Sequence, residues 1–161
     1  MHDPLTHLSH NARSLRESAI RRAGDLEASH PDLISLAPGF PDPQLFPWDE
    51  LREIAASVLR GSDPTVLQYG HTRGYRPLLE VFVEVLGERG IRAAPENVIV
   101  ATGSQQALDL CARVFVDPGD AVLVELPTYT GAITAFGNQH AHLVGVRQDA
   151  DGIDLKDLTP A

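Results

Sequence analysis

Two short stretches of the sequence carry residue types that suit the binding of a phosphorylated ligand. The first, Gly103-Ser104-Gln105, follows an apolar run and opens a segment with helical spacing. The glycine permits close approach, the serine hydroxyl adds a donor, and the first backbone N–H groups of a helix have no partner within it. A phosphate is the guest that this motif favours, although a simple helix cap at Ser104 is an equally good interpretation of the motif alone.

The second stretch, Pro127-Thr128-Tyr129, ends the next predicted strand. An aromatic ring there can stack on a flat ligand whose phosphate lies at the helix start, so the pair indicates a planar, phosphorylated ligand. Pyridoxal phosphate and nucleotides both meet that description. The sequence has neither the three spaced glycines of dinucleotide-binding proteins nor a P-loop with its lysine, which disfavours a nucleotide. For Tyr129 taken alone, core packing is the commoner explanation.

The elements that position these stretches alternate regularly along the second half of the sequence. Apolar runs separated by segments with helical spacing predict strands at 97–102, 121–126 and 142–146, helices at 104–116 and 129–137, and a turn at 117–120. Such a βαβαβ order predicts an α/β fold with a parallel sheet covered on both faces. Ligands of these sheets bind outside the carboxyl ends of the strands, where both stretches fall.

The first half of the sequence reads as helices joined by ordered loops. Helical spacing and terminal glycines predict helices at 13–29, 48–60 and 75–89, the last with an apolar stripe assigned to the core. The proline-rich segment 33–47 is an ordered loop, either a plain connector or a functional one. Between the later helices, residues 66–74 form a loop that carries the ring of Tyr69.

Composition limits the classes of partner. The chain has 161 residues, 43% of them hydrophobic, and a formal net charge of −9, so we expect one sizeable core and no binding of nucleic acid or of a membrane surface. The single cysteine, Cys111, has apolar neighbours and is predicted to be a buried thiol. No metal site is expected from the histidines near the N-terminus, and the absence of an apolar run there makes the cytoplasm the expected location.

Taken together, separate motifs resemble the N-terminal portion of the class I/II, fold type I pyridoxal-phosphate-dependent aminotransferases, nearest the branch with 2-aminoadipate and kynurenine aminotransferases. The resemblance runs from about Ser18 to the end, and it implies an N-terminal arm at 1–32 and an incomplete, three-layer, parallel-sheet cofactor-binding large domain at 33–161. The motifs that carry it are Ser18-Ala19-Ile20-Arg21, Leu36-Ala37-Pro38-Gly39-Phe40-Pro41-Asp42, Phe46-Pro47, Tyr69-Gly70 with Gly74, Gly103-Ser104-Gln105-Gln106, and Pro127-Thr128-Tyr129.

The resemblance also implies roles for individual residues. Ser104 and Gln105, next to Gly103, would hold the phosphate of pyridoxal 5′-phosphate, and Tyr129 would stack on its pyridine ring. Tyr69 would reach the cofactor phosphate of a second subunit, which implies a homodimer. Near the substrates, an amino acid and a 2-oxo acid, the resemblance places Gly39 and Arg21. These roles imply a place in amino acid metabolism.

The lysine that bonds to the cofactor in this family has no counterpart here. The only lysine, Lys156, falls in a charged segment that resembles the start of a surface helix, so no catalytic residue is assigned within the chain. We therefore expect an N-terminal fragment of an aminotransferase that is inactive alone. Two alternatives are a non-catalytic module that holds a phosphate ligand or a partner chain, and a piece that docks with a separately encoded remainder.

Overall fold

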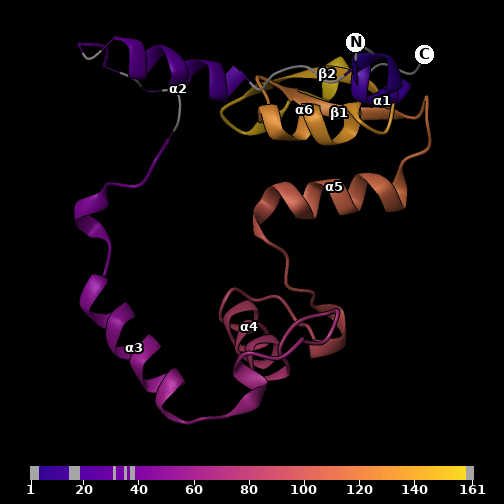
Figure 1. Cartoon of the computed structure of the whole chain (residues 1–161). Coiled ribbons are helices and arrows are strands. Elements are labelled where there is room, and N and C mark those ends of the chain that lie inside the picture. Colours follow the sequence, from indigo (N-terminus) through magenta and orange to yellow (C-terminus); the bar gives the residue numbers. More distant parts are fainter. Residues whose placement is uncertain (1–3, 15–18, 31, 35, 37–38, 159–161) are drawn as a thin grey trace. The chain divides into compact units, whose positions relative to one another are not determined.

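The structure is a computed structural model that describes residues 4–14, 19–30, 32–34, 36 and 39–158. Its helices and strands divide between two units (Figure 1). The first unit combines Met1–Gly39 with Thr102–Ala161, and the second is Phe40–Ala101.

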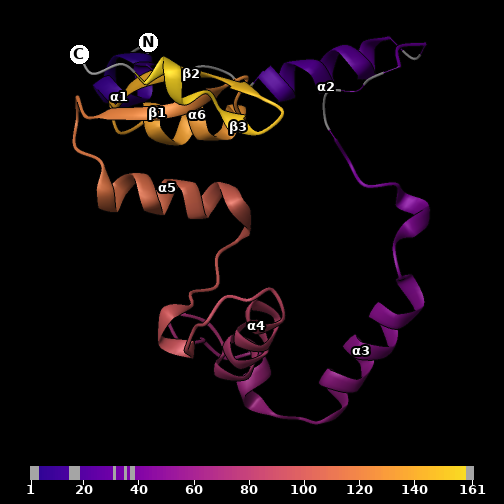
Figure 2. The same cartoon turned by 180° about the vertical axis from the view of Figure 1, so that it is seen from behind.

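The first unit is built on a small sheet. Strands β1 (Ala121–Leu126) and β2 (His142–Asp149) run parallel, with Ala121 opposite His142 and Leu126 opposite Arg147. Strand β3 (Gly152–Ile153) pairs antiparallel with the end of β2 (Figure 2). The parallel pair confirms the sequence prediction, whereas the short hairpin to β3 was not predicted.

Two helices accompany the sheet. Helix α6 (Thr130–Gly137) connects β1 to β2, and α5 (Gly103–Phe115) packs against α6 (Figure 1). Ala112 of α5, Ala135 of α6 and Val146 of β2 are buried and form the core of this unit. The prediction of a sheet covered on both faces is wrong for the described chain, because Leu123 and Leu126 of β1 are each 52% exposed.

The prediction that Cys111 is a buried thiol is wrong, because Cys111 is exposed. A helix turns about 100° per residue, so adjacent positions cannot face the same neighbour. In α5 the buried position is Ala112, and its neighbour Cys111 consequently lies off that face. Apolar neighbours in sequence therefore did not identify the buried side.

The N-terminal segment of the first unit contains short helices: η1 (Pro4–His7), α1 (His10–Ser14) and α2 (Ala19–Ser29). The predicted helix at 13–29 includes residues 15–18, which lie outside the described residues, as does Ser18 of the first family motif. The Asn11 side-chain amide donates a hydrogen bond of 3.3 Å to the carbonyl oxygen of Asn138, just after α6. Across the described ranges, no helix is both long and apolar enough to cross a membrane.

The second unit consists of helices and loops. It contains η2 (Pro43–Leu45), α3 (Trp48–Arg60), η3 (Pro64–Val66), α4 (Arg76–Glu88) and η4 (Pro95–Asn97). The two predicted long helices are confirmed, but the predicted strand at 97–102 is wrong. Instead of joining a sheet, this segment begins inside η4 and continues as a loop, in which the Val100 N–H donates to the Arg73 carbonyl at 2.8 Å.

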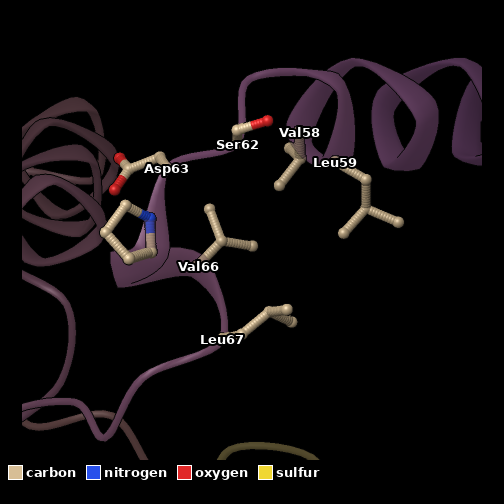
Figure 3. Close-up of a pocket in the computed structure, with 7 residues that line it drawn as sticks. Val58, Leu59, Ser62, Asp63, Val66 and Leu67 are labelled. Atoms are coloured by element: carbon tan, nitrogen blue, oxygen red, sulfur yellow. The ribbon is translucent and has the colours of Figure 1, made fainter.

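Burial in the second unit centres on Leu79 of α4, which is 4% exposed. The apolar stripe of α4 that was assigned to the core is only partly covered, with Val81 51% exposed. A shallow pocket of about 150 Å³ lies between the end of α3 and η3, where Val58, Val66 and Leu67 gather (Figure 3). The expected single sizeable core is therefore not present in the described chain.

An ion pair joins β2 to η5 (Leu155–Asp157) in the first unit. The Arg147 guanidinium donates to both carboxylate oxygens of Asp157, at 2.7 and 2.5 Å, and the Arg147 backbone N–H donates to the same carboxylate at 3.2 Å. These hydrogen bonds stabilise the ionised form, so the pKa of Asp157 is lowered and the pKa of Arg147 is raised.

The Asp157→Asn variant should therefore be less stable than wild type at neutral pH. Because the folded-state pKa of Asp157 is depressed, its contribution is present above the unfolded-state pKa of about 3.9 and is lost as the pH falls through the folded-state value. Urea unfolding between pH 7 and 2.5 should show the two proteins converging. Asp151→Asn, which removes the same charge from the β2–β3 turn, is the control; an equal loss in both variants would contradict a specific ion pair.

Candidate functional site

The start of α5 leaves donors available at its N-terminal end. The helix begins at Gly103, where φ is +80°, a conformation that favours glycine. The Gln106 side-chain oxygen accepts the N–H of Thr102, the residue before the helix. The N–H groups of Gly103, Ser104 and Gln105 have no intrahelical acceptor by virtue of their position. No acidic residue occupies the first turn, which favours an anion there.

Space is open at this helix start. A Cβ atom built on Gly103 meets no other atom within 4 Å, and Ser104 and Gln105 are exposed. The three residues that sequence reasoning selected therefore share one accessible turn, with backbone donors and one hydroxyl group. This chemistry suits a phosphate group.

The Tyr129 ring lies close to the Gln105 side chain, beside Gly131 in the first turn of α6. The Gln105 side-chain amide donates a hydrogen bond of 3.0 Å to the carbonyl oxygen of Gly131. A Cβ atom built on Gly131 would lie 2.1 Å from Gln105 Oε1 and 2.3 Å from Tyr129 Cε1. The Gln105 side chain and the Tyr129 ring thus meet above one glycine, and the ring stays 51% exposed.

The loop that carries Tyr129 is held at the end of β1. The Leu126–Pro127 peptide is cis, and the Gln148 side-chain amide of β2 donates to the Pro127 carbonyl oxygen at 3.1 Å. The ring of Tyr129 therefore sits on a segment attached to both parallel strands. A half-exposed aromatic ring near the α5 donors fits a planar group that carries a phosphate.

Tyr69 belongs to the second unit, where its side chain is 98% exposed. It borders a pocket of about 350 Å³ that also includes His71, Tyr75 and Arg76. Its loop is anchored at Arg73, whose carbonyl oxygen accepts a hydrogen bond of 2.8 Å from the Val100 N–H. An exposed ring on an anchored loop is available to contact another molecule.

Arginine side chains at the end of this loop and at the start of α4 bond to residues of α4 and η4. The Arg76 guanidinium donates to Glu80 at 2.9 Å and to Glu96 at 2.8 Å, and Arg73 donates to the Glu96 carbonyl oxygen. The hydrogen bond from Arg76 lowers the pKa of Glu96, and the two carboxylates raise the pKa of Arg76. The Arg73 side chain thus connects the loop to the backbone of η4, and the Arg76–Glu96 ion pair connects α4 to η4.

The two residues expected near a substrate are less fully described. Gly39 adopts φ +61°, which favours glycine, and a Cβ atom there would meet nothing within 4 Å. Arg21 lies in α2, but its side chain is outside the described part of the structure, as are Ala37 and Pro38 beside Gly39. The structure therefore brings together Gln105 and Tyr129 and does not test the placement of Arg21.

Sequence reasoning assigned no role to three residues that support the site. Gly131 provides the place where Gln105 and Tyr129 meet, Gln106 caps the start of α5, and Gln148 holds the loop after β1. A glycine inside a helix is a sequence signal that could have drawn attention to Gly131. Gln148 gives no local signal, because its partner, Pro127, is distant in the sequence.

Comparison with protein families gives one matching family over most of the chain. The sequence model of the family described as aminotransferase class I and II matches residues 31–161. Among curated proteins, the 2-aminoadipate transaminase of Thermus thermophilus is 43% identical over 147 residues. That similarity covers 91% of this chain and 36% of the relative.

Solved structures of similar proteins agree with this match. The kynurenine aminotransferase of Pyrococcus horikoshii, solved in complex with PMP, aligns with a TM-score of 0.85 and 37% identity over 97% of this chain and 38% of its own. The α-aminoadipate aminotransferase of Thermus thermophilus, complexed with N-(5′-phosphopyridoxyl)-L-leucine, aligns with a TM-score of 0.79 and 40% identity, over 96% of this chain and 37% of its own. The chain thus spans little more than a third of these relatives and has the fold of the corresponding part of fold type I enzymes.

Proposed function

Since the chain belongs to the class I and II aminotransferases, we propose that it supplies part of the cofactor site of an enzyme that moves an amino group between an amino acid and a 2-oxo acid. The cofactor is pyridoxal 5′-phosphate. The observation that carries the cofactor assignment is the meeting of Gln105, at the start of α5, with the Tyr129 ring above Gly131. Residues 1–32 then form an N-terminal arm, and residues 33–161 form an incomplete cofactor-binding large domain.

Each residue of the proposed site has a distinct task. When bound, pyridoxal phosphate supplies the electrophilic carbon and the electron-withdrawing ring that amino-group transfer needs. The backbone N–H groups of Gly103, Ser104 and Gln105 and the Ser104 hydroxyl hold the phosphate. Tyr129 packs on the ring and fixes its plane. Because the Gln105 side chain is bonded to Gly131, Gln105 contributes through its backbone N–H.

The substrate and subunit contacts extend the same proposal. Gly39 and Arg21 lie near the substrate, which is an amino acid or a 2-oxo acid. Tyr69 contacts the cofactor phosphate of a second copy in a homodimer, and its 98% exposure on an anchored loop supports that role. The protein works in cytoplasmic amino acid metabolism.

Binding of pyridoxamine 5′-phosphate tests the cofactor site. This probe has no aldehyde, so it cannot bond nonspecifically to Lys156 or the N-terminus. We expect saturable binding by the wild-type protein in calorimetric titration and roughly tenfold or greater weakening in Ser104→Ala, since a hydrogen bond to a charged group contributes about 1.5–3 kcal/mol. Ser57→Ala in α3, which belongs to the second unit, makes the same chemical change at a residue with no assigned role and should bind like wild type.

The dephosphorylated probe pyridoxamine separates phosphate recognition from a general effect. Ser104→Ala should leave the weaker binding of pyridoxamine unchanged, because that ligand has no phosphate to contact. Tyr129→Ala should weaken both ligands, since both contain the ring. Equal, unsaturable responses of wild type and Tyr129→Ala would argue against a cofactor pocket in this chain.

A further inference from the structure

Gly131 occupies a position where its backbone gives no reason for glycine. It lies in the first turn of α6 and does not have a positive φ, unlike Gly103, Gly119 and Gly152 of the same unit. Glycine in a helix is less stable than alanine, because more backbone freedom is lost on folding. A steric reason must therefore account for the missing side chain.

The surroundings of Gly131 supply that reason. The nearest atoms to a Cβ at this position are Gln105 Oε1 at 2.1 Å, Tyr129 Cε1 at 2.3 Å and Tyr129 Cζ at 2.6 Å. Distances below 3.0 Å do not occur between a real Cβ and its neighbours, so a methyl group would move at least one of these side chains. The same residue accepts the Gln105 amide hydrogen bond through its carbonyl oxygen.

We propose that Gly131 is a positioning residue, whose absent side chain allows the Gln105 amide and the Tyr129 ring to share one place beside the start of α5. The inference rests on the proposed function, because it assigns these two side chains a common purpose at the cofactor site. Gln105 ties α5 to α6, and Tyr129 is thereby held next to the donors of α5. Gly131 acts on the ligand only through these neighbours.

A matched pair of variants in α6 isolates this effect. Gly131→Ala adds a methyl group in the contact, while Gly137→Ala adds the same group in the same helix where nothing lies within 4 Å. We expect the Kd of pyridoxamine 5′-phosphate to rise about fivefold or more in Gly131→Ala and to stay within about twofold of wild type in Gly137→Ala. Thermal unfolding of both variants checks that the fold is retained.

A double-variant cycle distinguishes positioning from a structural role. If Gly131 acts through the Gln105 side chain, removing that side chain removes the closest obstacle at 2.1 Å. The alanine at position 131 should then have a smaller effect on the Kd in a Gln105→Ala background than in wild type, since coupled residues are not additive. Additive effects of the two substitutions would overturn the inference.

A ligand-free measurement keeps the inference separate from the proposed function. The side-chain NH₂ resonances of Gln105, assigned through their loss in Gln105→Ala, should shift in Gly131→Ala and not in Gly137→Ala. If wild type fails to bind the probe but these resonances shift as expected, the cofactor proposal fails and the placement of Gln105 by Gly131 stands. If wild type binds, yet Gly131→Ala leaves both the resonances and the Kd unchanged, the inference itself is wrong.

Discussion

Replacing Gly74 with alanine is expected to lower the free energy of unfolding of the second unit by roughly 3 kcal/mol or more. Two effects combine at this position. The backbone has φ +124°, which side chains rarely adopt, and a Cβ atom would lie 2.5 Å from Val100 Cγ2 and 3.0 Å from Val100 Cβ. Val100 is attached by its own N–H to Arg73, so it cannot move away without breaking that hydrogen bond.

Trp48 makes this effect measurable, because it is the single tryptophan of the sequence and lies in the same unit. Urea unfolding followed by its fluorescence should show an earlier midpoint for Gly74→Ala. Gly87→Ala is the matched control: it lies in α4 with open space around its Cβ, so it should leave stability unchanged or increase it by up to about 1 kcal/mol. Similar midpoints for Gly74→Ala and wild type would show that the contact with Val100 relaxes easily.

Local signals predicted α3, α4 and α5 well. The ends of α3 and α4 lie beside Gly61 and Gly90, and α5 begins at the glycine that opens its phosphate-type motif. Such signals act within one or two residues and need no distant partner. Strand β1 was also predicted at its observed bounds, because an apolar run between two clear turns leaves little choice.

Features that depend on neighbours were predicted poorly. The run at 97–102 has the apolar character of a strand, yet it forms no ladder and is attached to Arg73 by Val100. Pairing requires a second strand, which a local pattern cannot supply. The burial of Cys111 was wrong for a related reason: it depends on which face of α5 meets α6, and that face carries Ala112.

For the candidate site, residue type and spacing suggested candidate residues but not their arrangement. Ser104 and Tyr129 were found because a helix start after a glycine and an aromatic ring at a strand end each suggest chemistry. The role of Gly131 could not be assigned from residue type alone, since it consists of a missing side chain whose volume Gln105 and Tyr129 fill. Only the folded structure shows which side chains compete for that volume.

The 161-residue chain by itself is expected to transfer no amino group beyond the background of free pyridoxal phosphate. Transamination needs an amine that is positioned to move a proton between substrate and cofactor carbons, and a positioned acid–base group contributes about 100-fold to 10,000-fold in rate. The only amine side chain, on Lys156, is exposed in η5 after β3. Its backbone N–H bonds to Asp154 at 3.0 Å, and the neighbouring Asp157 is held by Arg147.

Single-turnover absorbance with a chromogenic amino donor measures this directly in wild type and Lys156→Ala. Both proteins should match the protein-free rate, because an exposed amine on a surface turn has no surroundings that would orient it toward bound substrate. Turnover that disappears in Lys156→Ala would make Lys156 catalytic and would overturn this expectation. Turnover that persists in Lys156→Ala would instead show that amino transfer proceeds without a lysine, a chemistry that the family similarity does not account for.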